Sequence, residues 1–243
     1  MKKMKNMSQD AKHIFNLLRE LSYRYDLVRV WQDFILLFAC AISNAVDKKH
    51  FAERERLYKK TIERYNEQEQ SIFPQIAAEI IMALEKNPEQ DCLGKLYMEM
   101  EISNKHAGQY FTPYSVSKMM AAMTTIDVID TVRKNGYATL NDPTCGAGAM
   151  LIASLHEAGE KLKKEEMNWQ NHLLVSGQDI DYTAALMCYI QLSLLGAAGF
   201  VKIGDSLTSP IAGMDSPEDC WFTPMYFSDV WALRRVISLA KAN

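Results

Sequence analysis

The chain has 243 residues, 48% of them hydrophobic, and its 27 basic and 30 acidic residues leave a formal net charge of −3. The length and apolar content allow a substantial buried core, while the slightly acidic balance argues against a protein that binds nucleic acid without a partner. No apolar stretch approaches the roughly 18 residues of a membrane span, no signal peptide is visible, and five cysteines without paired spacing favour reduced thiols in a cytoplasmic protein rather than a disulfide or zinc framework.

The first part of the chain, residues 1–105, contains a single glycine, Gly94, and is expected to be helical throughout. Apolar residues recur there at three- and four-residue spacing, which is the periodicity of amphipathic helices. The charge-rich stretch 50–70 keeps an apolar stripe, so its charges are expected to form a solvated helix face rather than a nucleic-acid surface. The expected helices cover residues 11–25, 27–43, 50–70, 72–85 and 92–102.

From about residue 106 onward the pattern alternates between helix and strand. Short apolar strands between longer helices indicate an α/β domain with a parallel sheet and right-handed crossovers. The expected helices cover residues 114–134, 148–165, 182–197 and 229–242. The expected strands cover residues 137–142, 172–180 and 200–205, with a further candidate strand at 219–227.

Three aspartates stand at the ends of these strands. Asp142, Asp179 and Asp205 each follow an apolar stretch, in YATLND, LLVSGQD and FVKIGD. Ligands of open parallel sheets bind at the carboxyl ends of the strands, so the three carboxylates are expected to face one site. One acid at a strand end is common, but three at successive strand ends beside a glycine-rich corner indicate a ligand site.

The corner has the sequence NDPTCGAGAM, residues 141–150. Gly146 and Gly148 allow the backbone to approach a ligand closely, and the next helix offers the positive end of its dipole. The dinucleotide pattern G-x-G-x-x-G is disfavoured because Leu151 stands where the third glycine belongs, and an ATP-binding loop would need a Lys-Ser/Thr pair after the glycines. A two-glycine turn by itself is also compatible with a purely structural corner.

Upstream of the corner, the stretch 106–120 places Thr112 and Pro113 at the expected N-cap and first turn of a helix. The start of a helix favours a negatively charged ligand group such as a carboxylate. Taken alone, the same pattern is typical of an ordinary, well-capped helix.

Four motifs follow one another in order: GQYFTP at 108–113, DPTCGAGAM at 142–150, GQDID at 177–181 and GDSL at 204–207. Together they resemble the adenine-N6 DNA methyltransferases, and most of all the modification subunit of type I restriction systems. The resemblance implies an α/β fold: a Rossmann-like methyltransferase sheet in residues 106–243 that binds S-adenosylmethionine, preceded by an all-helical N-terminal domain in residues 1–105. It implies no metal site.

The resemblance also implies roles for individual residues. Thr112 would lie near the carboxylate of the cofactor, and the corner beneath its methionine and ribose. Asp179 would accept hydrogen bonds from the ribose hydroxyls and Asp205 from the adenine amino group, both of which suit an ionised carboxylate. Asp181 is expected to cap the next helix. The implied cofactor-binding residues are Tyr110, Phe111, Thr112, Asp142, Thr144, Cys145, Gly146, Asp179, Ile180, Asp205 and Ser206.

One motif of the family is missing after Asp205: an Asn or Asp followed by two prolines and an aromatic residue, which holds the target amino group and stacks the flipped base. Its counterpart here is TPMY, with Thr223, Pro224 and Tyr226 as candidate catalytic residues. A threonine is a shorter acceptor than an amide, so any activity is expected to be weak. The alternative is a buried strand with a proline bend.

These features give three functional hypotheses. The first is an adenine-N6 DNA methyltransferase that acts with a partner supplying DNA recognition, since the stretch after Leu207 is expected to be too short for a target-recognition domain. The second is a catalytically inactive S-adenosylmethionine-binding subunit that acts in regulation or assembly, and the third is a methyltransferase with a non-DNA substrate. The helical N-terminal domain is a candidate surface for a protein partner, and no membrane contact is expected.

Overall fold

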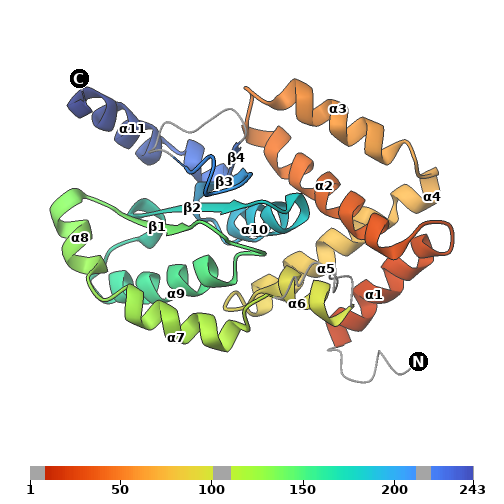
Figure 1. The fold of residues 1–243 in the computed structure, drawn as a ribbon, viewed down its shortest axis with the longest axis horizontal. Coiled ribbons are helices and arrows are strands. Elements are labelled where there is room, and N and C mark those ends of the chain that lie inside the picture. Colours follow the sequence, from red (N-terminus) through yellow and green to blue (C-terminus); the bar gives the residue numbers. More distant parts are fainter. Residues whose placement is uncertain (1–8, 101–110, 212–219, 243) are drawn as a thin grey trace.

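The fold comes from a computed structural model that describes residues 9–100, 111–211 and 220–242. Figure 1 shows a helical part at the right, formed by the N-terminal half, and an α/β part around a small sheet at the left. One continuous hydrophobic core runs through both parts, with members from Ala11 in the first helix to Trp221 in the last strand. The two parts therefore stabilise each other through shared packing.

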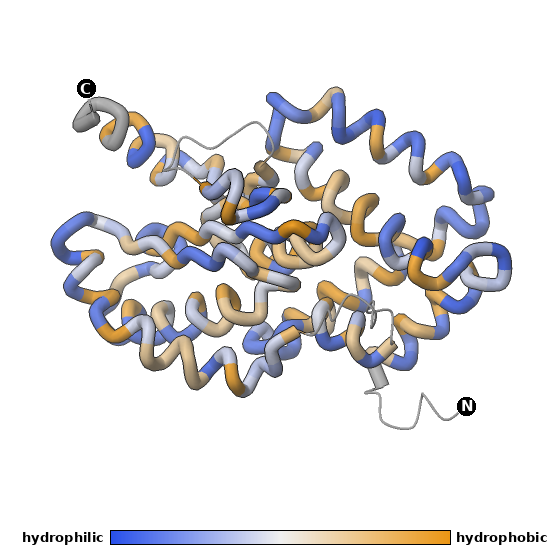
Figure 2. Tube along the Cα trace, viewed as in Figure 1, coloured by the Kyte–Doolittle hydropathy of each residue, from blue (hydrophilic) through white to orange (hydrophobic). Residues whose placement is uncertain are grey.

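The helical part forms where the apolar periodicity predicts helices. Figure 2 shows that the outer helices α3 and α4 are mostly hydrophilic, which fits a solvated face for the charge-rich stretch 50–70. Helix starts are capped by short polar side chains: Asp26 accepts from the N–H of Val28 at 3.0 Å, and Asn66 and Glu69 form a capping box. The helices are α1 (Gln9–Ser22), α2 (Leu27–Val46), α3 (Phe51–Ile62), α4 (Glu67–Gln70), α5 (Ile72–Lys86) and α6 (Cys92–Glu99).

Helix α2 combines the composition of a membrane span with the packing of a core helix. It has 20 residues and is apolar enough to cross a bilayer by length and composition, so the expectation that no segment approaches a span was wrong. Its Trp31 and Phe34 are buried in the core, and its buried Asp33 accepts hydrogen bonds from Arg64 and Tyr65. In this fold α2 is the central helix of the helical part, packed between α3 and α10.

The α/β part contains a four-stranded sheet in the order β1-β2-β3-β4. Strands β1 to β3 are parallel, with Asp142 opposite Gly177 and Asp179 opposite Ile203, so their carboxyl ends lie at one edge of the sheet. This confirms the expected α/β fold behind a helical N-terminal region. The elements are α7 (Tyr114–Thr124), α8 (Val128–Asn135), β1 (Ala138–Asp142), α9 (Ala149–Lys164), η3 (Trp169–Asn171), β2 (Leu173–Asp179), α10 (Tyr182–Leu194), β3 (Ala198–Ile203), β4 (Cys220–Phe222), η4 (Pro224–Phe227) and α11 (Asp229–Ala242).

Both faces of the sheet are covered at β2 and β3, whereas Thr139 and Asn141 of β1 are exposed. Successive residues of a strand face opposite sides: Val175 joins the main core under α9 and α10, while its neighbour Leu174 packs in a second, smaller core. That smaller core also contains Phe200 of β3, Tyr226 of η4 and Trp231 of α11. In an open sheet of parallel strands, the carboxyl ends of the strands are the place for a ligand.

Three elements differ from the sequence expectation. The helix expected at 50–70 is two helices, α3 and α4, with a break at residues 63–66. The helix expected at 114–134 is two helices, α7 and α8, because Thr124 and Thr125 donate their hydroxyls to carbonyls four residues earlier and compete with the helix ladder at the break. The last strand, β4, is only three residues long and antiparallel to β3, so the sheet is mixed rather than wholly parallel.

Candidate functional site

The corner after β1 depends on two glycines in the left-handed region. Gly146 has φ 54° and Gly148 has φ 101°, values that residues with a side chain adopt at a cost. A Cβ atom at Gly146 would lie 3.1 Å from the ring of Phe111. The corner therefore needs glycine both for its backbone conformation and for space.

Hydrogen bonds join the corner to the end of β2. The N–H of Cys145 donates to the carbonyl of Gln178 at 2.9 Å. The N–H of Gly146 donates to Asp179 Oδ2 at 2.8 Å, and the N–H of Asp181 donates to Asp179 Oδ1 at 2.9 Å. An ionised carboxylate has about four acceptor positions, so Asp179 retains acceptor capacity for a ligand. Asp181 also accepts from the N–H of a residue in the first turn of α10, which confirms it as the N-cap.

Asp142 is a second carboxylate at the corner, and its charge is costly there. Burial raises the pKa of the Asp142 carboxyl, and so does the nearby charge of Asp179, whereas the N–H of Thr144, which donates to Asp142 Oδ1 at 3.0 Å, lowers it. A cationic group in front of Asp142 would offset the cost of its ionised form.

The end of β3 lies directly beside the end of β2. The N–H of Gly204 donates to the carbonyl of Asp179 at 2.9 Å, and this contact places Asp205 and Ser206 next to the corner. Asp205 Oδ1 accepts a backbone N–H at 2.8 Å, and this bond lowers the pKa of the Asp205 carboxyl. Ile180, the residue after β2, leaves 74% of its surface exposed and offers an apolar surface beside these acids.

Phe111 and Thr112 cover the corner from the opposite side, just before α7. Helix α7 has Pro113 rather than Thr112 as its N-cap residue, one position later than expected. The ring of Phe111 packs against Tyr97 of α6, with centroids 5.5 Å apart, so this cover is held by the helical part. Tyr110, expected beside them, lies outside the described residues.

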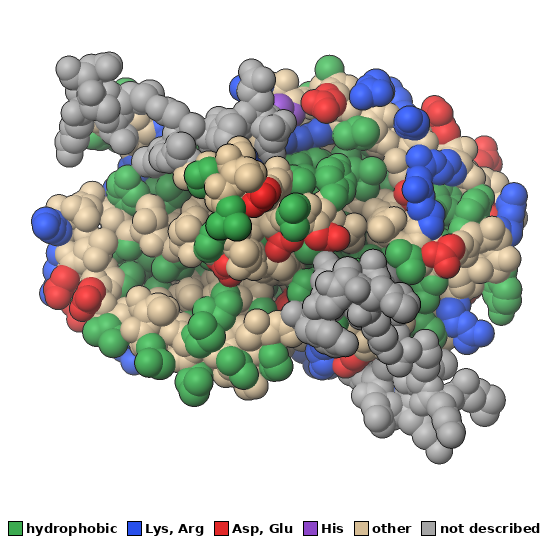
Figure 3. Space-filling model, in the orientation of Figure 1, with side chains coloured by type: hydrophobic (Ala, Val, Ile, Leu, Met, Phe, Trp, Pro, Cys, Tyr) green, Lys and Arg blue, Asp and Glu red, His purple; other side chains and the backbone are tan. Residues whose placement is uncertain are grey.

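The corner, Asp179, Phe111 and Thr112 line a cavity of about 230 Å³, which we call the corner cavity. The predicted residues Ile180, Asp205 and Ser206 lie outside its lining. Three carboxylates line it, those of Asp91, Asp142 and Asp179, and its described lining contains no Lys, Arg or His. Figure 3 shows acidic side chains gathered near the middle of this face of the molecule. Such a surface disfavours phosphate ligands and favours an organic cation. Within the described part of the chain, no group of three or more His, Cys, Asp or Glu side chains is arranged to hold a metal ion.

A second cavity, which we call the outer cavity, shares Asp91, Phe111 and Thr112 with the corner cavity. Its volume is about 490 Å³, within the ~300–1,000 Å³ that is typical of small-molecule sites. It lies between α6 and the start of α7. A ligand seated at the corner therefore has room to extend toward the helical part.

Asp91 and Gln191 belong to this site, although sequence analysis did not identify them. Asp91 is the N-cap of α6 and only 6% exposed. Gln191 of α10 is fully buried: its Nε2 donates to Asp91 Oδ1 and to the carbonyl of Ala147, each at 2.8 Å, and its Oε1 accepts from the N–H of Leu93 at 3.0 Å. In the sequence Asp91 shows only a capping pattern, which is the same for exposed and buried helix starts.

The structure does not bring Thr223 to the corner. Its side chain is fully buried, and its hydroxyl donates to the carbonyl of Ala197 at 2.7 Å and accepts from the N–H of Gly199 at 3.0 Å. Both partners lie at the amino end of β3, whereas Asp205 follows the carboxyl end. Because Thr223 is fully buried and hydrogen-bonded to β3, its hydroxyl is out of reach of a target base.

Pro224 and Tyr226 are also structural. They form the short turn η4 after β4, and Tyr226 packs edge-to-face against Phe200 in the smaller core, with ring centroids 6.1 Å apart. The arrangement is the buried strand with a proline bend, and the catalytic interpretation of TPMY is not supported by this placement.

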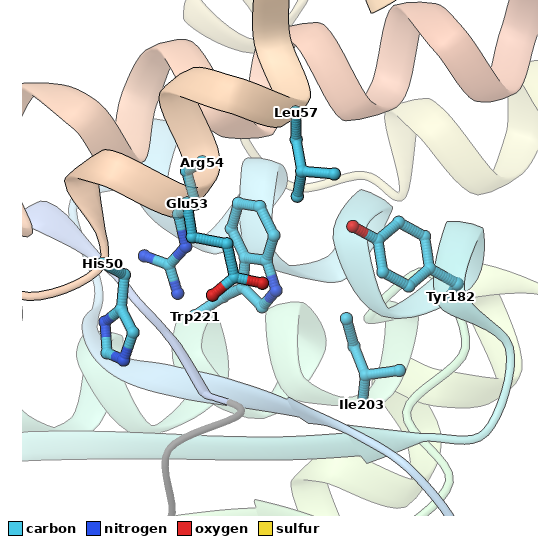
Figure 4. Close-up of a pocket in the computed structure, with 7 residues that line it drawn as sticks. All are labelled: His50, Glu53, Arg54, Leu57, Tyr182, Ile203 and Trp221. Atoms are coloured by element: carbon cyan, nitrogen blue, oxygen red, sulfur yellow. The ribbon is translucent and has the colours of Figure 1, made fainter. Parts of the chain in front are cut away.

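A separate cavity of about 240 Å³ lies between α3 and the sheet, and Figure 4 shows Glu53 and Tyr182 pointing into it from α3 and α10. The buried Arg54 forms part of its wall. Arg54 donates to Asp47 Oδ2 at 2.7 Å and to the backbone of β4 at 2.7 Å, and it lies 4.1 Å above the ring of Trp221. These contacts hold the helical part against the sheet.

The fold and the site together define the class of protein: an α/β protein with a Rossmann-like methyltransferase sheet, whose first strand ends at an acidic corner with two left-handed glycines. Comparison with known proteins agrees. Residues 89–241 match the model of the N-6 DNA methylase family, and the chain belongs to this family. The match begins upstream of residue 105 and includes Asp91.

One relative is the methylase subunit of the type I restriction enzyme MjaIX of Methanocaldococcus jannaschii, with 32% identity over 122 residues. The alignment covers 48% of this chain but only 19% of that protein, so the chain spans about a fifth of its relative. A solved structure assigned as a class I S-adenosylmethionine-dependent methyltransferase of Listeria monocytogenes aligns with 84% of this chain and 55% of its own, at 16% identity and a TM-score of 0.41.

The cofactor of this family is S-adenosylmethionine, and the corner cavity fits it. The cofactor carries a sulfonium and an ammonium charge against one carboxylate, so it is a net cation at neutral pH. Three carboxylates and no base in the described lining match that charge. Gly146 and Gly148 leave the space above the turn free of side chains.

Proposed function

We propose that this chain is the cofactor-binding part of an adenine-N6 DNA methyltransferase that modifies DNA only together with a partner. The observation that carries the proposal is the acidic corner cavity, which suits a cationic methyl donor. S-adenosylmethionine supplies an electrophilic methyl group on its sulfur. Membership of the N-6 DNA methylase family and similarity to a type I methylase subunit support adenine in DNA as the acceptor.

Each described residue of the site has a role in holding the cofactor. Asp179 accepts hydrogen bonds from the ribose hydroxyls with the acceptor capacity that its two backbone N–H bonds leave. Asp205 accepts from the adenine amino group, and the exposed Ile180 packs against the ring. Thr112 binds near the methionine carboxylate. The remaining proposed contacts among the described residues are Phe111, Asp142, Thr144, Cys145, Gly146 and Ser206, and Tyr110 is proposed from the sequence resemblance alone.

The partner has two tasks in this proposal. It reads the DNA sequence, and it helps to present the target adenine, because Thr223, Pro224 and Tyr226 are committed to packing away from the cavity. We place the contact with a protein partner on the helical part. The five cysteines are buried and none forms a disulfide, which supports a reducing, cytoplasmic location.

A second candidate is an S-adenosylmethionine-binding subunit without catalysis, which regulates or assembles a restriction-modification complex. The burial of Thr223 favours it, since the described residues at the corner cavity include no Asn-Pro-Pro-aromatic motif to hold a flipped base. The two candidates share the cofactor site and differ in whether a methyl group reaches DNA.

Calorimetric titration with S-adenosylmethionine tests the shared part of both candidates. We expect micromolar binding to the wild-type chain and none detectable to Asp179→Ala. Transfer of a labelled methyl group to adenine-containing duplex DNA, measured with and without a type I specificity subunit, then separates them. Transfer only with the subunit supports the methyltransferase, binding without transfer in either case supports the inactive subunit, and no binding by the folded wild type contradicts both.

A further inference from the structure

The carboxylate of Asp91 is buried at the junction of the two cavities. It is 6% exposed, and it lines both the corner cavity and the outer cavity, as does Thr112. Its two recorded hydrogen bonds, from the N–H of Gly94 and from Gln191 Nε2, both end on Oδ1 at 2.8 Å. Among the described contacts, Oδ2 receives no donor, so one oxygen of a buried carboxylate remains available to a ligand.

No cation in the described structure neutralises Asp91. Burial raises the pKa of its carboxyl, while the bonds from Gln191 and Gly94 lower it. Lys95 lines the outer cavity, but its ammonium lies 3.9 Å from Glu99, and its side chain is 57% exposed. An unpaired buried carboxylate is costly to a fold, so its presence at a ligand cavity calls for a cationic partner.

Helix capping does not account for a carboxylate at this position. Capping uses one side-chain oxygen, and an asparagine provides it equally well. Asp26 caps α2 in the same way from an exposed position, where an ionised group is solvated. At position 91 the carboxylate lines two cavities instead of bulk solvent, and the amide of Gln191 fixes it between α6 and the carbonyl of Ala147 in the corner.

We propose that Asp91 Oδ2 binds the α-ammonium group of the methionine moiety of S-adenosylmethionine. The inference rests on the proposed function, because it requires this cofactor at the corner. The ammonium and the carboxylate of methionine share one carbon atom, so an acceptor for the ammonium has to lie close to the site of the carboxylate. Asp91 and Thr112 line the same two cavities and supply groups of complementary character. The helical part thereby binds the amino-acid end of the cofactor, and the carboxyl ends of the strands bind its nucleoside end.

Calorimetry on the full chain tests this assignment with a set of ligands that differ in the methyl group, the carboxylate or the ammonium group. S-adenosylmethionine, S-adenosylhomocysteine and decarboxylated S-adenosylmethionine all carry the ammonium, whereas 5′-methylthioadenosine does not. We expect Asp91→Asn to weaken the first three by about 10–100-fold, the cost of a charged hydrogen bond of ~1.5–3 kcal/mol. Affinity for 5′-methylthioadenosine should stay within about twofold, and Asp26→Asn should leave all four affinities unchanged.

Asn at position 91 keeps the acceptor for Gly94 and Gln191, and a thermal unfolding midpoint checks that the variant is folded. The proposal is overturned if folded Asp91→Asn binds S-adenosylmethionine like the wild type. It is also overturned if 5′-methylthioadenosine loses as much affinity, since Asp91 would then act on the shape of the cavity, or if decarboxylated S-adenosylmethionine alone is unaffected. A wild-type chain that binds none of the four ligands removes the proposed function itself, and this proposal with it.

Discussion

The corner after β1 and the edge where β4 meets β3 each place a proline beside a threonine, but the two sites differ in burial and hydrogen bonding. Both contain a proline, a threonine and small or aromatic neighbours, and both resemble parts of a methyltransferase motif set. At the corner, carboxylates face a cavity and keep acceptor capacity. At the β3–β4 edge, the hydroxyl of Thr223 is fully buried and hydrogen-bonded to β3, and Tyr226 is packed into a core. Unused hydrogen-bonding capacity at a cavity, rather than residue type, separates a ligand site from a structural bend.

The largest expected effect of a single substitution is a loss of cofactor affinity at the corner. Asp179→Ala removes the proposed acceptor for the ribose hydroxyls, and we expect S-adenosylmethionine affinity to fall at least about 100-fold, since each charged hydrogen bond contributes ~1.5–3 kcal/mol. The N–H groups of Gly146 and Asp181 also lose their acceptor, at a cost of about 1–3 kcal/mol in stability. Asp181→Ala is the control, because it removes a helix cap and no ligand contact. Unchanged affinity in Asp179→Ala would contradict the assignment.

At the β3–β4 edge we expect a substitution to lower stability without changing cofactor affinity. Thr223→Val leaves the N–H of Gly199 without its acceptor in a fully buried position, so the free energy of unfolding should fall by about 1–3 kcal/mol. Cofactor affinity should not change. Chemical denaturation and calorimetry measure the two effects. Thr223→Asn, which introduces the amide of the family motif, should not increase methyl transfer, and a clear increase would restore TPMY as a degenerate catalytic motif.

A smaller loss of cofactor affinity is expected from a substitution at Gly146 in the turn. Gly146→Ala places a methyl group against the ring of Phe111 and strains a left-handed residue by ~1–2 kcal/mol, so both stability and cofactor affinity should fall, the latter by several-fold. Gly136→Ala is the matched control: it has φ 84° at the end of α8, away from the cavity. It should lose stability and keep its affinity. Equal affinity losses in both variants would show that Gly146 has no special relation to the ligand.

The smallest expected effect is a pH dependence. Because the pKa of the Asp142 carboxyl is raised, it protonates at a higher pH in the folded chain than in the unfolded chain. Its contribution to the stability of the free protein is therefore present at low pH and lost as pH rises through the folded pKa. Affinity for a cation should change in the opposite direction and fall with decreasing pH. Titrations at pH 7 and pH 5 should show a smaller decrease for Asp142→Asn than for the wild type, and equal decreases would exclude Asp142 as the source.

Much of the fold is predictable from the sequence because the periodicities are strong. Helix α10 and strands β2 and β3 lie where apolar runs predict them, and the three aspartates stand at one edge because parallel strands end together. The orientation of β4 was not predictable, since three residues carry too little pattern to show which neighbour they pair with. Length and composition also failed to show how α2 packs, because buried helices and membrane spans share both.

Other parts of the site depend on long-range contacts that no local pattern records. Gln191 and Asp91 are 100 positions apart, and their hydrogen bond exists only because α6 packs against α10. A glutamine within an apolar helix and an aspartate before a helix are each ordinary. For the same reason Thr223 looks accessible in the sequence and is buried against β3 in the structure.

The buried thiols of Cys145 and Cys188 at the corner can report how often the turn opens. Cys145 belongs to the turn itself. Its hydrogen bond with Cys188, together with burial, raises the pKa of the Cys188 thiol. A thiol with a raised pKa is a poor nucleophile. Cys145 lines the corner cavity but is only 5% exposed, so an alkylating reagent should reach its sulfur faster when the turn moves away from α10. The alkylation rate of Cys145 therefore reports how often the turn opens. A ligand bound at the corner should lower this rate in proportion to the fraction of protein that it occupies.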